Sequence, residues 1–384
     1  MPRKICVVTG TRAEYGLLRP VMTKLKSDQD LIFQLVVTGT HLSAQHGMTV
    51  REIEADGFVP NELVAIDLED DSKLGVASAL ANATAKFSES FSRIAPDVVV
   101  VLGDRYEILA CVQSALIMGI PVAHIHGGEV TTGAFDDSIR HAITKMSNIH
   151  FVAAQEYARR VIQLGEQPHT VFNVGSLGVE LAQSMPLLSS DELSNSLNLD
   201  LTKKVLLVTF HPTTRSDNSS SDETKELLAA LDNFGYCTII FTGTNADPGN
   251  SEITSQIEKF VSSDTKNRAS FKSLGQTKYF SLMKICSAVV GNSSSGIIEA
   301  PSFKVPTVNI GTRQDGRLRA ESIIESRTER GEIKVAIETA LSSTWRERCS
   351  KTKSVYGSDN TAQLITGTLK TVELTTQKKF FDLV

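Results

Sequence analysis

The stretch that decides the fold is residues 97–105, which read Asp-Val-Val-Val-Val-Leu-Gly-Asp-Arg. Four valines and a leucine follow one another with no polar residue between them, so the run lacks the alternation of a half-buried strand. Unbroken apolar runs are typical of parallel strands buried on both faces. A glycine and an aspartate follow directly, so the sequence predicts that Asp104 leaves this strand at the edge of a sheet.

Similar runs recur along the chain and are separated by helical lengths. The predicted strands are 4–9, 31–38, 97–102, 121–124, 149–153 and 171–174 in the first half, and 204–210, 237–242, 288–290 and 307–310 in the second. Strands alternating with helices across short loops predict an α/β protein with two doubly wound parallel sheets. We expect a first domain at 1–185, a second at 186–360 and a closing helix over 358–370, with the linker in the polar stretch 189–200.

Composition excludes several classes of protein. The 384 residues carry a formal net charge of −5, and a nucleic-acid partner held by bulk electrostatics would need a basic surface. The five cysteines are scattered without CxxC or Cys/His metal spacing, which favours buried reduced thiols and no metal. The N-terminus runs straight into a predicted strand, and no apolar run reaches membrane-spanning length. We therefore expect a soluble, cytoplasmic protein without a membrane partner.

Residues 288–301 predict an anion-binding turn. They read Ala-Val-Val-Gly-Asn-Ser-Ser-Ser-Gly-Ile-Ile-Glu-Ala-Pro, a buried strand followed by hydroxyls and a helix start. Unpaired amides and hydroxyls at a helix N-terminus attract anions, although a serine-rich cap that binds nothing is the alternative. His211, Arg313 and a Gly-Thr-Asn turn at 243–245 follow other predicted strands of this half, and Glu299 is placed to accept from ribose hydroxyls. Together these groups predict a nucleotide site.

The first half carries acid and base groups at its strand ends. His126 and Glu129 lie in His-Ile-His-Gly-Gly-Glu at 124–129, where extended spacing predicts the two histidines on one side. Asp136 and Asp137 open a predicted helix; one of them suffices as a cap. With Asp104 they form a carboxylate–imidazole cluster suited to proton transfer in both directions. The alternative for Asp104 is a structural ion pair with Arg105.

Two further turns hold candidate side chains. Residues 9–16 read Thr-Gly-Thr-Arg-Ala-Glu-Tyr-Gly, a glycine turn in which Arg12 offers a planar donor to phosphate or carboxylate. The turn is not GxGxxG, so a dinucleotide site is not supported. His41 lies in the turn after the second predicted strand, where it serves either acid–base chemistry or the turn itself.

These motifs, in their order and spacing, resemble the hydrolysing UDP-N-acetylglucosamine 2-epimerases over nearly the whole chain. The motifs are Gly-Thr-Arg-Ala-Glu-Tyr-Gly, Gly-Asp-Arg-Tyr-Glu, His-Ile-His-Gly-Gly-Glu, Phe-Asp-Asp-Ser-Ile-Arg-His, Phe-His-Pro, Gly-Asn-Ser-Ser-Ser-Gly and Gly-Thr-Arg-Gln. The resemblance implies two Rossmann-like domains facing a cleft, as in the B-type glycosyltransferase fold, with residues 361–384 returning to the first domain. It also implies a homodimer or homotetramer that needs no cofactor.

By resemblance, the activity converts UDP-GlcNAc and water to N-acetylmannosamine and UDP. An anti elimination expels UDP and leaves a 2-acetamidoglucal, which water then hydrates; a close branch acts on a UDP-2,4-diacetamido-2,4,6-trideoxyhexose. The residues implied to hold the UDP-sugar are Arg12, His41, Arg105, His211, Asn245, Ser293, Ser294, Glu299 and Arg313. Those implied for proton transfer or sugar contacts are Asp104, His126, Glu129, Asp136 and Asp137. Many members have glutamate where this chain has His126, which leaves the C2 base open between His126 and Asp104.

Three other functions fit the same scaffold. A glycosyltransferase would share the fold, but the carboxylate cluster favours elimination over sugar transfer. A non-hydrolysing epimerase would return UDP-ManNAc, whereas His-Gly-Gly-Glu with Phe-Asp-Asp-Ser-Ile-Arg-His resembles the hydrolysing branch. A binding regulator without turnover would lack the acid and base groups that are abundant here.

Overall fold

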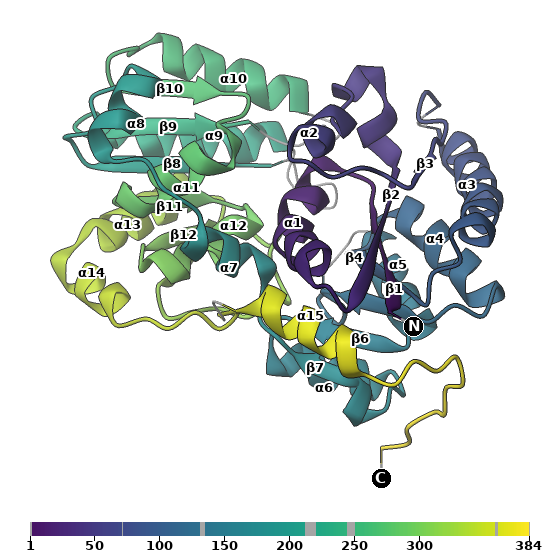
Figure 1. The fold of residues 1–384 in the computed structure, drawn as a ribbon. Helices are drawn as coiled ribbons and strands as arrows, with labels where there is room; N and C mark the ends of the chain where they lie inside the picture. The colour runs from purple at the N-terminus through teal and green to yellow at the C-terminus, as the bar shows by residue number, and fades with distance from the viewer. Residues whose placement is uncertain are drawn as a thin grey trace. The chain divides into compact units, whose positions relative to one another are not determined.

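The computed structural model describes residues 2–70, 72–130, 135–211, 220–243, 250–357 and 360–383. They cluster into two compact units (Figure 1). Unit 1 comprises Met1–Glu129, Ala134–Leu181 and Ser358–Val384, and unit 2 is built on Ala182–Gly357.

Unit 1 is built on a seven-stranded parallel sheet in the order β3-β2-β1-β4-β5-β6-β7. The strands are β1 Arg3–Thr9, β2 Leu31–Thr38, β3 Glu62–Val64, β4 Val98–Leu102, β5 Val122–Ile125, β6 Ile149–Val152 and β7 Val171–Asn173. From β1 the order runs outward to β2 and β3 on one side and through β4 on the other. The strand order therefore reverses between β1 and β4, although all strands remain parallel. Ligands of open α/β sheets bind at the carboxyl ends of the strands beside such a point.

Helices cover both faces of this sheet (Figure 1). They are α1 Arg12–Ser27, α2 Val50–Ala55, α3 Lys73–Ile94, α4 Tyr106–Ile117, α5 Phe135–Met146, α6 Gln155–Gln163, α7 Leu177–Ser184 and α15 Thr361–Thr371. Leu18 of α1 and Ile365 of α15 belong to the core on one face, and Phe87 of α3 and Cys111 of α4 to the core on the other. Apolar residues of β4 are buried in both cores, which explains why the valine run contains no polar residue on either face of the strand.

Unit 2 repeats the same topology with six parallel strands in the order β10-β9-β8-β11-β12-β13. The strands are β8 Val205–Thr209, β9 Thr238–Thr242, β10 Arg268–Phe271, β11 Ala288–Gly291, β12 Thr307–Ile310 and β13 Ile323–Ser326. The helices are α8 Ser190–Leu197, α9 Ser220–Leu231, α10 Asn250–Ser262, α11 Gly275–Ile285, α12 Ser294–Ile298, α13 Arg330–Leu341 and α14 Ser343–Ser350. In this sheet the strand order reverses between β8 and β11.

The prediction of an α/β fold with two doubly wound parallel sheets is confirmed. The predicted linker at 189–200 is wrong, because most of that stretch is helix α8. Its Ser189 side chain accepts from Glu192 N, and the Glu192 carboxylate accepts from Ser189 N, which is a capping box. Leu193 and Leu197 supply the buried face that docks this otherwise polar helix.

All five cysteines are buried, as predicted, and unpaired. Across the described ranges, no helix combines the length and the apolar character needed to cross a membrane.

Candidate functional site

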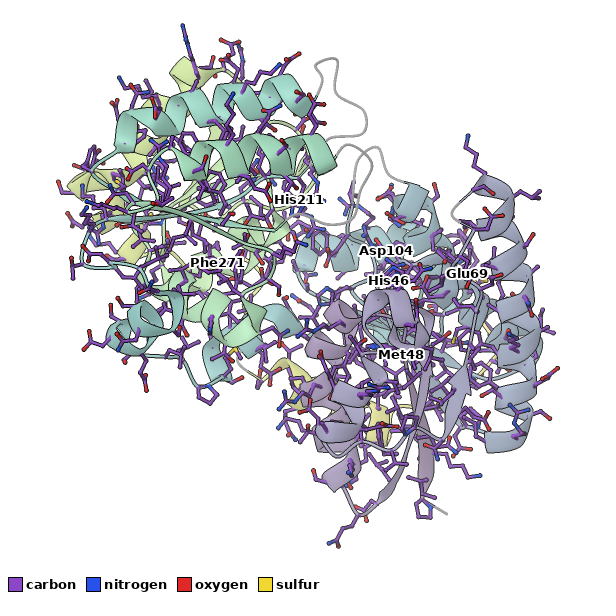
Figure 2. The ribbon with its side chains drawn as sticks, turned by 90° about the horizontal axis from the view of Figure 1, so that it is seen from above. His46, Met48, Glu69, Asp104, His211 and Phe271 are labelled. Atoms are coloured by element: carbon purple, nitrogen blue, oxygen red, sulfur yellow. The ribbon has the colours of Figure 1, made fainter. Side chains whose placement is uncertain are left out.

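In each unit, candidate side chains lie at the carboxyl ends of the two strands that flank the reversal of the sheet. Figure 2 labels one from each unit: Asp104, which follows β4, and His211, which follows β8. The two units are described separately below.

The turn after β1 is shaped by Glu14, which reaches back to the start of α1. The Glu14 Oε2 atom accepts hydrogen bonds from Gly10 N at 2.8 Å and Thr11 N at 3.2 Å, and the Thr11 hydroxyl accepts from Glu14 N. This capping box fixes the first turn of α1 and presents Arg12 at its start. The exposed Arg12 side chain lies 3.0 Å from the Glu52 carboxylate, a surface ion pair of small net energy that a phosphate can replace.

Asp104 is bound by Arg140 and not by its chain neighbour Arg105. The Arg140 guanidinium, only 6% exposed, donates to Asp104 Oδ2 and lies 3.7 Å from Asp137 Oδ1. Asp137 also lies 3.5 Å from His141 Nε2, one helical turn further along α5. The cluster therefore joins the end of β4 to the first turns of α5. Asp136 lies in the same first turn and is partly buried.

His126 and Glu129 approach each other in the turn after β5, with His126 Nδ1 3.2 Å from Glu129 Oε1. The strand ends at Ile125, and His126 adopts φ +66°, a left-handed conformation. The extended spacing predicted to put His124 and His126 on one side is therefore interrupted. His126 Nε2 is buried without a hydrogen-bond partner among the described residues, so this imidazole nitrogen is available for proton transfer.

Gly127 and Gly128 are required because neighbouring residues pack closely against their backbone. An added Cβ on Gly127 would lie 2.9 Å from the Thr144 hydroxyl, and one on Gly128, which has φ +76°, would lie 2.5 Å from Tyr157 O. His124 is fully buried behind this turn, with Nε2 2.8 Å from Gly103 O and Nδ1 3.1 Å from Thr144 Oγ1. Burial lowers the pKa of His124 to about 3, so the ring is neutral and structural.

His41 is also an interior residue. Its ring is fully buried, with Nδ1 2.7 Å from Thr49 Oγ1 and Nε2 3.1 Å from Thr9 Oγ1. Burial lowers its pKa to about 4, so it is neutral at pH 7. Both ring nitrogens are occupied by hydroxyls, which favours support of the loop after β2 over direct contact with a ligand.

Arg105 is held by Glu107, two residues along, with 2.5 Å between Arg105 Nε and Glu107 Oε1. Glu107 is 1% exposed, whereas the Arg105 side chain is 41% exposed. The buried carboxylate thus anchors one edge of the guanidinium and leaves the rest of it toward solvent, where it can meet an anion.

In unit 2, Asn292 organises the predicted nucleotide turn. Its side chain forms two hydrogen bonds with the backbone of His211. Its backbone carbonyl accepts hydrogen bonds from Arg313 Nη1 at 3.1 Å and from Gln314 Nε2 at 2.8 Å. The turn before it needs glycine, because a Cβ on Gly291 would lie 1.9 Å from Thr209 O. Three of the strand-end segments of this sheet therefore meet at one asparagine.

The serine turn itself opens a short helix. Ser293 is the N-cap of α12 without a side-chain capping bond, Ser294 is its first residue, and all three serines are partly exposed. Glu299 is the C-cap of this five-residue helix. Tyr279 of α11 hydrogen-bonds Ser295, and burial raises its pKa to about 12. His211 is 7% exposed, and burial lowers its pKa to about 4, with Arg313 adding to the effect.

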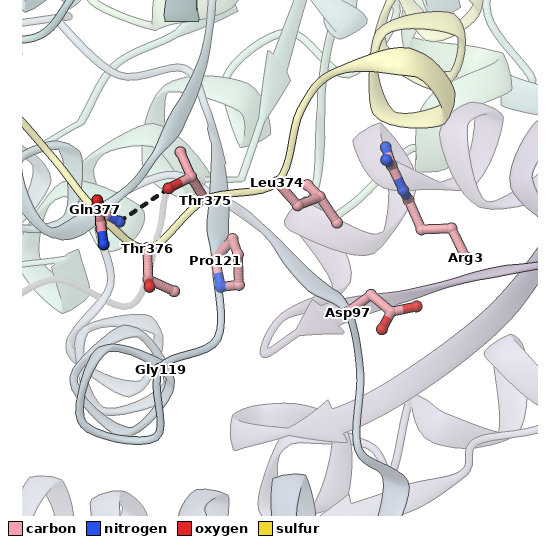
Figure 3. Close-up of a pocket in the computed structure, with 8 residues that line it drawn as sticks. All are labelled: Arg3, Asp97, Gly119, Pro121, Leu374, Thr375, Thr376 and Gln377. Atoms are coloured by element: carbon pink, nitrogen blue, oxygen red, sulfur yellow. Dashed lines mark hydrogen bonds between the residues drawn. The ribbon is translucent and has the colours of Figure 1, made fainter. Parts of the chain in front are cut away.

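One predicted residue, Asn245, lies outside the described residues. In the part of the chain that is described, no group of three His, Cys, Asp or Glu side chains is arranged to hold a metal ion. A cavity of about 500 Å³ lies elsewhere, lined by Arg3, Asp97, Gly119, Pro121 and residues 374–377 (Figure 3). It adjoins the amino ends of β1, β4 and β5, so it is separate from the candidate site.

Sequence reasoning missed three residues that hold the site together. Arg140 could have been found from its spacing, three residues after Asp137 on a predicted helix. Asn292 stood within the quoted serine motif, but nothing in the sequence shows that its side chain reaches His211. Tyr279 lies on α11, outside the motifs identified in the sequence, so no sequence pattern indicated that it belongs to the site.

Two Rossmann-like units with this strand order define the class, α/β proteins of the B-type glycosyltransferase fold. A sequence profile of the UDP-N-acetylglucosamine 2-epimerase family matches residues 23–370, and the chain belongs to this family.

Three relatives show where in the family the similarity is high. A GDP/UDP-N,N'-diacetylbacillosamine 2-epimerase (hydrolyzing) of Campylobacter jejuni is 44% identical over 324 residues, 84% of each chain. The polysialic acid biosynthesis protein P7 of Escherichia coli is 42% identical, covering 86% of this chain and 84% of its own. A UDP-N,N'-diacetylbacillosamine 2-epimerase (hydrolyzing) of Legionella pneumophila is 35% identical over 98% of both chains.

Solved structures agree on the fold. The UDP-GlcNAc 2-epimerase of Neisseria meningitidis bound to UDP-GlcNAc superposes with a TM-score of 0.75 at 17% identity, covering 95% of this chain and 99% of that one. The predicted family is thereby confirmed from sequence, and the predicted two-sheet fold from structure.

Proposed function

We propose that this chain is a hydrolysing 2-epimerase that converts a UDP-linked 2-acetamido sugar and water to UDP and the free 2-epimeric sugar. The observation that carries the proposal is the set of acid and base groups at the carboxyl ends of two neighbouring strands. Asp104 follows β4 and is linked through Arg140 to Asp137 of α5, and the His126–Glu129 pair follows β5. Two of the relatives above bear the name of a hydrolysing 2-epimerase, which supports it.

The reaction has two steps, each with its own requirement. In the elimination, a base removes the C2 proton, the C1–oxygen bond breaks, its electron pair leaves with UDP, and a C1–C2 double bond forms. In the hydration, water adds oxygen at C1 and a proton is returned to C2 on the face that inverts it. Both steps need groups that accept and return protons near neutral pH.

The residues divide between these steps by chemistry. The two candidates for the C2 base are Asp104 and His126, whose buried Nε2 has no hydrogen-bond partner among the described residues. Glu129 beside His126 stabilises the imidazolium that forms if His126 takes the proton. Asp136 and Asp137, at the start of α5, are left to position water or the sugar.

The UDP part is assigned to groups that bind anions and hydroxyls. Ser293, Ser294 and Arg313 are proposed for the phosphates, together with Arg12 and Arg105 of unit 1 and with Asn245. His211 and Glu299 are proposed for the nucleoside, where a carboxylate accepts from ribose hydroxyls.

Two sugars compete as the substrate. The family and the relative from polysialic acid synthesis support UDP-GlcNAc, with N-acetylmannosamine as product. The 44% identical relative is named for GDP- or UDP-linked N,N'-diacetylbacillosamine and the 35% identical one for the UDP-linked form. These names support a sugar in which C4 carries a second acetamido group and C6 is deoxygenated. A relative named for UDP-N-acetylglucosamine is 32% identical, below both of these, so we propose the diacetamido sugar as the preferred substrate.

The experiment is a side-by-side measurement of UDP release from both sugars with no acceptor present. We expect release from both, with the larger kcat/KM for UDP-N,N'-diacetylbacillosamine. A larger value for UDP-GlcNAc reverses the choice of sugar, and no UDP release from either removes the hydrolysing activity itself.

A further inference from the structure

Glu14 and Glu107 are two buried carboxyl groups that the proposed reaction does not use. They are 6% and 1% exposed. Both lie against the same glycine of the turn after β1: an added Cβ on Gly10 would lie 3.1 Å from Glu107 Oε1 and 3.4 Å from Glu14 Oε2. Both carboxyls therefore lie beside the turn that presents Arg12.

Each carboxyl uses only one of its oxygens. Glu14 Oε2 accepts from the Gly10 and Thr11 amides, and Glu107 Oε1 accepts from Arg105 Nε. The other two oxygens, Glu14 Oε1 and Glu107 Oε2, are buried and have no hydrogen-bond partner among the described residues. Leaving two carboxylate oxygens buried and unpaired is costly, and protonation of one carboxyl lowers this cost because it removes a buried negative charge.

The surrounding charges favour that proton on Glu14. Burial raises the pKa of Glu14 to about 8, and the negative charges of Glu107 and Asp104 add to this, whereas the Gly10 amide and Arg105 oppose it. Two other titratable groups nearby are neutral at pH 7, because burial lowers the pKa of His41 and raises that of Tyr106. Arg12 in the same turn is paired with Glu52, and Arg105 is paired with Glu107.

We propose that Glu14 keeps its proton beside Glu107, which positions Arg105 near the Gly10–Arg12 turn, so that loss of the Glu14 proton weakens binding of the substrate's diphosphate. The inference rests on the proposed function, in which Arg12 and Arg105 contact UDP. A second negative charge beside the turn repels the diphosphate and competes with it for the Arg105 guanidinium. Glu14 and Glu107 are positioning residues, since they act through Arg105.

The first test is the affinity of the whole protein for UDP, measured by titration calorimetry between pH 7 and pH 9.5. For the natural protein we expect the affinity to fall roughly tenfold between pH 8 and pH 9.5, as Glu14 ionises. Glu14→Gln imitates the protonated carboxyl, because its amide keeps a capping oxygen and adds a donor. Its affinity should stay constant over this range.

Two results overturn the inference. One is a flat pH profile in the natural protein, which needs no variant to interpret. The other is the same fall in Glu14→Gln as in the natural protein, since Glu14 would then not be the titrating group.

The second test is a double-mutant cycle that asks whether Glu107 acts through Arg105. Glu107→Gln should weaken UDP binding roughly tenfold in the natural background and have no further effect beside Arg105→Ala. Equal effects in both backgrounds contradict the positioning role. UDP release from a UDP-sugar is measured in parallel: turnover with pH-independent UDP binding refutes only this inference, whereas absence of UDP binding at pH 7 refutes the proposed function with it.

Discussion

Asn292 and His211 are joined by two hydrogen bonds: His211 N donates to Asn292 Oδ1 at 2.7 Å, and Asn292 Nδ2 donates to His211 O at 2.9 Å. Asn292 is 1% exposed, so both bonds are shielded from water. The amide thereby ties the end of β8 to the turn after β11, across the reversal of the second sheet. The two segments act as one wall of the proposed nucleotide site.

Asn292→Leu should therefore destabilise unit 2 and weaken UDP binding together. Leucine has a similar volume but removes both hydrogen bonds between Asn292 and the backbone of His211, which costs about 2 kcal/mol. Urea unfolding and UDP titration measure the two effects. Asn233→Ala is the matched control, because Asn233 is exposed and its side chain donates to Ala229 O and Ala230 O of the preceding helix α9. Equal stability of both variants would contradict the assigned role.

Asp104→Asn should lower kcat about 100-fold or more while UDP still binds, because it removes a proton-transfer group from the proposed reaction. Asp97→Asn is the control on the same polypeptide segment: Asp97 precedes β4 at its other end, is exposed and accepts from Lys4 N. It should leave turnover within about twofold, as is usual for a surface change. Near-normal turnover in Asp104→Asn would remove this residue from the catalytic set.

Ser294→Ala combined with Arg313→Ala should chiefly weaken UDP binding, by about tenfold or more, since hydrogen bonds to a charged group contribute about 1.5–3 kcal/mol each. Arg348→Ala provides the comparison, because Arg348 lies on α14 and is exposed. If the double variant binds UDP as tightly as the natural protein does, the proposed phosphate contacts are incorrect.

Stability should fall as the pH is lowered below about 6.5, because His41 and His124 are buried as neutral rings. Their folded pKa values are about 4 and about 3, below the ordinary value of 6.5. The unfolded chain therefore binds more protons between these limits, and each histidine removes about 2 kcal/mol between pH 7.5 and pH 5.0. Urea unfolding at both pH values measures this loss.

His41→Gln separates this effect from general acid sensitivity. Glutamine can still bond a threonine hydroxyl but does not titrate, so the variant should lose about 2 kcal/mol less on acidification. The same pH dependence in both proteins would show that His41 does not contribute.

The sequence was most informative where physical constraints are local. The unbroken run Val98–Leu102 identified a strand buried on both faces, and it is one. The strands that were missed, β3, β10 and β13, lie at the edges of their sheets, where partly exposed positions mix polar with apolar residues and break the signal. The same reasoning took α8 for a linker, because only Leu193 and Leu197 of that helix are buried.

Pairing within the site was harder to predict. The strand ends predicted that Asp104 and His126 lie at the same edge of the sheet, because parallel strands share one carboxyl edge. Which side chain meets which depends on packing: Arg105 turns to Glu107, and Asp104 is met by Arg140 from α5. The Asp104–Arg140 pair joins segments 36 residues apart in the chain, so it depends on tertiary packing, which no local pattern reveals.

The central claim is tested most directly by proton NMR of the products formed from a UDP-2-acetamido sugar in D₂O with no acceptor. Elimination followed by hydration predicts free UDP and a free 2-epimeric sugar that carries deuterium at C2, because the proton returned to C2 comes from solvent. Accumulation of a UDP-linked epimer, or a UDP-sugar that stays intact, would contradict the account.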